Sequence, residues 1–212
     1  MIGIMSEEAF ERVNLILHSV PKGAEKALTG IVTRARTTAR VTALTGITSV
    51  YDIKQKDVRD RQNTTINMKT RKVSGGVVGE VSFSGAKIPL YRFGVSHKQP
   101  KTQGTKIPVN FGGRWALVAP GAPVSARQRK DKPLTQFENV FIGRMKSGHI
   151  GMFERKHQGL DRLPIREIMG SSTAQMAADT EILSKVETAT METISKRTEH
   201  EISRILHGYG GK

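Results

Sequence analysis

No proline or glycine occurs from about Thr173 to His207, which lies within the longest stretch of the chain that lacks both. Both residue types interrupt helices, and the stretch is rich in alanine, glutamate, lysine and methionine, which favour them. It therefore predicts one continuous helix, about 50 Å long at a rise of ~1.5 Å per residue. Charges of both signs are interspersed with an intermittent apolar face, which is typical of a solvated helix or of one flank of an oligomer.

The amino-terminal part of the chain predicts two further helices. From Ser6 to Val20 the apolar residues follow helical spacing, Ser6 can cap the first turn, and two glutamates follow it where the helix dipole favours anions. Pro21 can begin the next helix, which the apolar spacing carries from Ala24 to about Leu44. Gly46 is predicted to end that helix, since glycine is common just beyond a helix terminus.

The middle of the chain changes to short alternating segments. Apolar and polar residues alternate around Ile53, Ile66 and Val81, Gly75-Gly76 signals a turn, and Pro89 favours a strand edge or end. These features predict an α+β fold in which a small, mostly antiparallel sheet is flanked by amino-terminal helices and a long carboxy-terminal helix. We predict one domain over residues 1–212, with a helical part at 6–45, a β-rich core at 49–158 and the terminal helix at 172–207.

Positive charge is unevenly distributed. The formal net charge is +15, and no aspartate or glutamate occurs between Val81 and Lys130. Such a balance favours a polyanion, an acidic protein surface or a crowded assembly as the neighbour. Loops rich in proline, glycine and polar residues flank the segment RWALVAP in this window, and long loops are usually functional. We predict that these basic residues face DNA or a partner protein: Lys98, Lys101, Lys106, Arg114, Arg127, Arg129 and Lys130.

Any nucleic-acid contact in this window is expected to be with phosphate, independent of base sequence and sensitive to salt. No helix-turn-helix, RRM or zinc-finger pattern is present. Four aromatic side chains could stack on bases, but their strand-like positions predict that they fill the core instead: Tyr91, Phe93, Phe111 and Trp115.

The residue types and spacings predict no catalytic, cofactor or metal site. The chain has no cysteine, which excludes disulfides, thiol catalysis and cysteine-ligated zinc. His200 and His207 lie two helical turns apart, about 10 Å along the axis, too far to share one ion. Asp52, Asp57 and Asp60 could serve a metal-dependent nuclease, but lysines and arginines surround them and predict solvated ion pairs. We therefore expect a protein that is not an enzyme.

The segment RMKSGHIGMFERK, Arg144 to Lys156, predicts a β-hairpin. Two short apolar strands are linked by KSG, with His149 at the turn, no third metal ligand and no nearby acid–base pair expected. Substitution of His149 should be nearly silent, whereas Phe153→Ala should impair assembly. The apolar residues of the hairpin are predicted to lie in the core or in a subunit interface: Phe141, Ile150, Met152 and Phe153.

Several motifs occur in a characteristic order. IPLYRFGVS is followed by a basic loop, then by FENVFIGRMKSGHIGMFERK, then by RLPIREIMGSSTAQM and the long terminal helix. In this order the chain resembles the minor tail protein Z family of tailed bacteriophages and prophages, which are tail completion proteins. The resemblance is strongest from Ile88 to Met176 and extends to the rest in general layout.

The resemblance implies a structural virion protein at the head-proximal end of the tail, assembled in the host cytoplasm. It implies a homo-oligomeric, six-fold ring that contacts the tail terminator and the head completion or connector proteins. The basic loops would face either DNA phosphates in the channel or an acidic rim on a neighbouring ring. No apolar run is long enough for a membrane span, and MIGIMSEEAF lacks the basic region of a secretory signal. A sequence-independent nucleic-acid-binding protein is the alternative.

Overall fold

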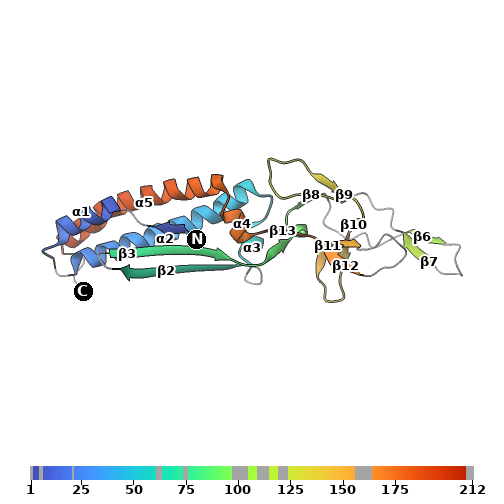
Figure 1. The fold of residues 1–212 in the computed structure, drawn as a ribbon, viewed down its shortest axis with the longest axis horizontal. Helices are drawn as coiled ribbons and strands as arrows, with labels where there is room; N and C mark the ends of the chain where they lie inside the picture. The colour runs from blue at the N-terminus through green and yellow to red at the C-terminus, as the bar shows by residue number, and fades with distance from the viewer. Residues whose placement is uncertain are drawn as a thin grey trace.

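The computed structural model describes residues 2–4, 7–20, 22–60, 64–73, 76–96, 105–108, 115–118, 124–155 and 164–208. It confirms an α+β fold with a long carboxy-terminal helix. The molecule is elongated, with the long helices and a three-stranded sheet at one end and the shorter strands at the other (Figure 1).

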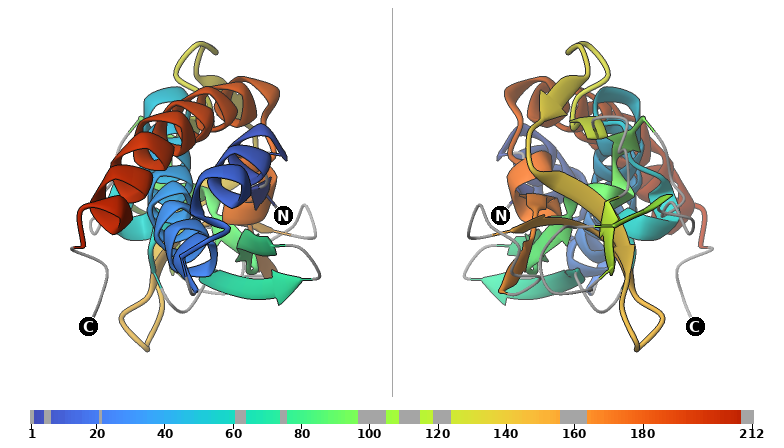
Figure 2. Two further views of the ribbon diagram at one scale, coloured as in Figure 1. Left: turned by 90° about the vertical axis from the view of Figure 1, so that its left-hand side faces the viewer. Right: turned by 90° about the vertical axis from the view of Figure 1, so that its right-hand side faces the viewer.

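Long helices pack side by side at the first end (Figures 1 and 2). The second and the last of them run antiparallel, because Gly30 lies against the Glu201 side chain and Thr193 Oγ1 donates to Thr38 Oγ1 over 3.2 Å. A row of buried alanine, valine, leucine and isoleucine side chains fills the seam between them. The helices are α1 (Glu7–Leu17), α2 (Gly23–Val50) and α5 (Thr180–Leu206).

The prediction that the second helix ends at Gly46 is wrong. α2 continues through this glycine to Val50. A Cβ atom on Gly46 would lie 3.0 Å from the Ile182 side chain, so the missing side chain lets α5 approach α2 closely. Glycine lowers helix propensity by about 1 kcal/mol relative to alanine, and the close packing of the two helices offsets this cost.

A three-stranded antiparallel sheet covers the other side of α2. Its strands are β1 (Ile2–Ile4), β3 (Gly76–Ser84) and β2 (Thr65–Val73), in the order β1-β3-β2. Val77 and Val81 of β3 are buried where the strand packs on α2. The strands predicted around Ile66 and Val81 are thereby confirmed. We call α1, α2, α5 and this sheet the helical half.

The carboxy-terminal helix is interrupted, so the predicted continuous helix is wrong in one place. A short helix, α4 (Thr173–Ala177), ends at Ala178, and α5 begins after Asp179. Ser172 caps α4 in a capping box with Gln175, in which each side chain accepts a hydrogen bond from the backbone of the other residue. Asp179 Oδ1 accepts a hydrogen bond from Glu181 N over 3.1 Å and caps α5.

The remaining strands form small antiparallel sheets, not the single sheet that was expected. Those of the described residues have two or three strands each. We call them, with the 3₁₀-helix Leu90–Arg92, the β-rich half. They are β4 (Lys87–Pro89) with β13 (Met169–Ser172); β5 (Gly94–Val95), β8 (Val124–Arg127) and β9 (Thr135–Phe137); β6 (Thr105–Pro108) with β7 (Trp115–Val118); and β10 (Val140–Arg144), β11 (Ile150–Arg155) and β12 (Ile165–Glu167).

Among the described residues of the β-rich half, Phe93 is the largest fully buried side chain. A Cβ atom on Gly170 would lie 2.7 Å from its ring, so only glycine fits there. The prediction that Phe93 fills the core is confirmed, and Tyr91 packs against that core half-buried. Phe111 lies outside the described residues, and for Trp115 only the backbone of β7 is described.

Candidate assembly surface

The two halves meet where the carboxy-terminal end of α2 reaches the end of β8. Asp52 N donates to Gln128 O over 2.7 Å, and Lys130 N donates to Val50 O over 2.9 Å. The strand predicted around Ile53 is wrong, because this part of the chain contributes only a single bridge. We call the contact region the junction; it comprises residues 48–52, 127–131 and 179–181.

Arg129 lies at the centre of the junction. Its Nη1 donates to Asp179 Oδ2, its Nε donates to Asp131 Oδ1 over 3.0 Å, and its Nη2 lies 3.7 Å from Glu181 Oε2. The guanidinium carbon lies 5.6 Å from the centroid of the Tyr51 ring, a cation–π contact. Tyr51 Oη donates to Asp179 Oδ2 over 3.1 Å. One cation therefore joins α2, β8 and the first turn of α5.

This arrangement shifts the ionisation of its members. Burial raises the pKa of Tyr51 above its usual range, and the hydrogen bond to Asp179 and the charge of that carboxylate raise it further. The hydrogen bond with Asp131 raises the pKa of Arg129, and the same bond lowers the pKa of Asp131. At neutral pH the phenol is therefore protonated, while the guanidinium and the carboxylate are charged.

The other two described side chains of the predicted basic set are also engaged within the chain. Arg127 Nε donates to Asp52 Oδ2 over 2.7 Å, and Lys130 Nζ donates to Thr48 O over 2.7 Å. Arg127, Arg129 and Lys130 thus hold the two halves together. Lys98, Lys101 and Arg114 lie outside the described residues, and for Lys106 only the backbone of β6 is described.

Two of the aspartates considered for a metal-dependent nuclease also form ion pairs within the chain. Asp52 pairs with Arg127, and Asp57 Oδ1 accepts from Arg92 Nη1 over 2.9 Å. The expected ion pairs are present at these two positions, but Asp57 is buried, not solvated, and both partners lie more than thirty residues away. Sequence spacing could not identify such partners.

The predicted hairpin is confirmed as β10 and β11. Phe141 pairs with Phe153 across the strands, and Gly148 adopts a φ of 84° in the turn. Met152 and Phe153 are buried, whereas Phe141 and Ile150 are half-buried. The first two are therefore core residues of the subunit itself, and Phe153→Ala would weaken the hairpin as well as any interface.

His149 has an acidic partner, so the expectation of no nearby acid–base pair is wrong. Its Nε2 lies 2.7 Å from Glu167 Oε1, and Glu167 is brought there by the pairing of β12 with β11. Gly151 makes the contact possible, since a Cβ atom there would lie 2.3 Å from the Glu167 carboxylate. The His149 ring stands edge-on to Phe153, with centroids 6.2 Å apart. The pair links the turn of the hairpin to the neighbouring strand.

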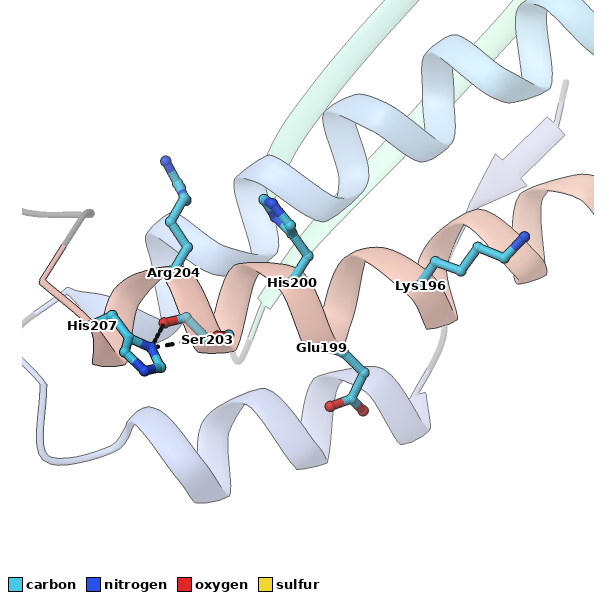
Figure 3. A pocket seen from close by; sticks show the side chains of 6 residues that line it. All are labelled: Lys196, Glu199, His200, Ser203, Arg204 and His207. Atoms are coloured by element: carbon cyan, nitrogen blue, oxygen red, sulfur yellow. Dashed lines mark hydrogen bonds between the residues drawn. The ribbon is translucent and has the colours of Figure 1, made fainter.

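Histidines also line an open hollow of about 800 Å³ on the last turns of α5 (Figure 3). His207 Nδ1 bonds to Ser203 O over 2.7 Å, while His200 and Arg204 point to the opposite side of the helix from Glu199 (Figure 3). Arg204 Nη2 makes an ionic contact of 2.6 Å with Glu201 Oε2, although the two groups are not aligned as a hydrogen bond. Within the described ranges, no three histidine, aspartate or glutamate side chains are grouped to hold a metal ion.

Compared with protein-family models, with curated proteins and with solved structures, the chain gives no match. Among the helices that the structure describes, none is both long and apolar enough to cross a membrane.

Proposed function

We propose that the chain is a structural virion protein, a tail completion or neck protein at the head-proximal end of a phage tail. It acts by binding, not by catalysis. Copies of the chain form a ring, six-fold to match the symmetry of tail tubes, which joins the tail terminator to the head completion proteins around the DNA channel. The ordered motifs from Ile88 to Met176 support the family, and the geometry supports an assembling subunit.

The observation that carries the assembly role is the elongated arrangement of the two halves in the described part of the chain (Figure 1). The sheets of the β-rich half have only two or three strands each among the described residues. Such small sheets are marginal until other elements cover them, and neighbouring subunits would supply that cover.

The junction supports the same function in a second way. Because Arg127, Arg129 and Lys130 are paired inside the chain, they link the two halves. A subunit with two linked ends suits an adaptor that must present one surface to the tail and another to the head.

Sedimentation of the purified chain, alone and with a tail terminator, tests the proposal. We expect a ring-sized species at high protein concentration or on addition of the terminator. Microscopy of a phage lacking the gene should then show separate heads and tails, or joined particles that fail to deliver DNA. A monomer under every condition, together with normal particles from the deletion phage, would contradict the proposal.

A sequence-independent nucleic-acid-binding protein is the second candidate, and the net charge of +15 favours it. It predicts that the isolated chain binds duplexes of unrelated sequence equally well, with affinity that falls steeply as salt rises. Absence of binding at low salt would end this candidate and leave the neck role untouched.

A further inference from the structure

Among the described strands, β2 has a hydrogen-bonded neighbour on one side only. It lies at the border of the sheet order β1-β3-β2, and it lies on the side of α2 opposite α5 (Figures 1 and 2). Its nine residues pair with β3 in unbroken register, from Thr65 opposite Ser84 to Val73 opposite Gly76. In an antiparallel strand, every second residue then turns its N–H and C=O toward the open side.

Within the described part of the chain, the open edge lacks several of the usual protections. Long edge strands are commonly shielded by proline, by a bulge or by a covering segment. β2 contains no proline and has no register shift. The side chains of Thr65, Asn67, Lys69 and Thr70 are exposed, and that of Met68 is 37% exposed. The protective feature that the described residues retain is positive charge.

Two arginines of α2 add to this charge. Arg36 Nη1 donates to Thr70 Oγ1 over 2.8 Å, which places this face of the helix beside β2. Arg40 lies one turn further along the same face, because residues four apart in a helix share a face. Among the described residues, no carboxylate forms an ion pair with Arg36, Arg40 or Lys69. Arg36 Nε is moreover buried without an acceptor.

We propose that the open edge of β2 binds an extended, acidic segment of another protein as an additional antiparallel or parallel strand. The backbone of that segment would pair with the free N–H and C=O groups of β2. Every second side chain of the bound segment would lie on the face of the sheet that packs on α2, beside Arg36 and Arg40. These two cations favour glutamate or aspartate at those alternate positions. This inference stands on the strand edge and the cations, and it does not depend on a neck role.

Charge and hydrogen-bonding geometry favour this occupant over two others. A second copy would bring β2 against β2, and the strand carries Lys69, Arg71 and Lys72 with no acidic residue. Like charges opposite one another destabilise such a pair. Nucleic acid would satisfy the cations, but a phosphate backbone cannot pair with alternating peptide donors and acceptors along nine residues.

The test uses the full chain and a terminally blocked peptide in which glutamate alternates with valine. We expect the peptide to bind at up to millimolar concentration and to slow amide hydrogen exchange in residues 65–73. Arg40→Glu should weaken binding about tenfold or more by placing a like charge beside the acidic strand. Arg34→Glu is the matched control, since Arg34 is exposed and lies about 200° around α2 from Arg36. It makes the same change in net charge and should leave binding nearly unchanged.

Four results would overturn the inference. One is equal binding of a peptide with lysine in place of every glutamate. A second is binding of the acidic peptide with no added exchange protection in β2, and a third is an equal loss of binding for Arg34→Glu and Arg40→Glu. The fourth is a failure to bind the acidic peptide while duplex DNA binds in an Arg40-dependent manner, which would assign this surface to nucleic acid. Circular dichroism of both variants confirms that each retains its helices.

Discussion

The helical half and the β-rich half are built on different principles. In the helical half, α2 and α5 lie along one another over almost their whole lengths, with residues such as Ile31, Ala35 and Val186 repeated at helical spacing in one buried seam. In the β-rich half the strands are short, and some pair with distant segments of the chain, as β13 does with β4. Its sheets have two or three strands each among the described residues.

Because of this difference, the two halves are stabilised by different kinds of interaction. A helix forms its hydrogen bonds within one segment and needs only one partner face, whereas a small sheet is marginal until other elements cover it. We infer that the β-rich half depends on the junction and, in an assembly, on neighbours. The helical half provides the support on which it is held.

Truncation of one buried side chain in each half should show the difference between the halves most strongly. Ile182 and Met152 are both fully buried, so replacing either with alanine should cost about 2–5 kcal/mol. Ile182→Ala should lower the denaturant midpoint of the whole protein. Met152→Ala should instead speed amide exchange in β10–β12 while α2 and α5 stay protected. Equal loss of protection in both halves for both variants would show that they unfold as one unit.

Removal of the Asp179 carboxylate should have the next largest effect. Asp179→Ala removes the cap of α5, worth about 0.5–2 kcal/mol, together with the acceptor for Tyr51 and Arg129. Asp179→Asn retains an oxygen that can cap the helix but removes the charge that faces Arg129. Chemical denaturation should rank the proteins wild type, asparagine, alanine in falling stability. If asparagine is as harmful as alanine, the charge matters more than the cap.

The junction should also weaken at high pH. Because folding raises the pKa of Tyr51 above the unfolded value of 10.0, its contribution is fully present below pH 10 and is lost as pH rises through the folded pKa. The denaturant midpoint should therefore fall as the pH rises above about 10. Tyr51→Phe lacks the titrating phenol and is the control, with a smaller fall over the same range. A fall of the same size in both proteins would assign the effect to other groups.

The smallest effect is expected at His149. Its ring is 37% exposed and pairs with a Glu167 side chain that is 25% exposed, so His149→Ala should cost only about 0.5 kcal/mol. The change should appear as faster exchange in the turn between β10 and β11, with no effect on α2 or α5. A loss above about 2 kcal/mol would mean that the pair organises the hairpin, since such costs are typical of buried groups.

Much of the helical half could be predicted from sequence, and the errors there have clear causes. Apolar spacing located α1 and α2, the long stretch without proline or glycine located α5, and the strands around Ile66 and Val81 followed from alternation. The error at Gly46 arose because the residues near it in the sequence do not reveal its contact with the distant Ile182. The break at Asp179 was missed because aspartate neither stops a helix as proline does nor differs in pattern from other surface acids.

The candidate site was harder to predict. The hairpin was located because turn signals and strand alternation are local. The engagement of Arg129 with Asp179, fifty residues away, was not predictable, because a basic residue in an acid-free window gives no sign of distant carboxylates. The partner of His149 was missed for the same reason, since Glu167 reaches it only through the pairing of β12 with β11.

The sequence by itself determined the positions of most helices and strands, the excess of positive charge and the location of the hairpin. These depend on interactions between residues within a few turns or strands of one another. Only the tertiary structure decided which cations are paired within the chain, which glycine permits helix packing and which strand edge stays open. Those outcomes depend on contacts between distant segments, which form only when the whole chain has folded.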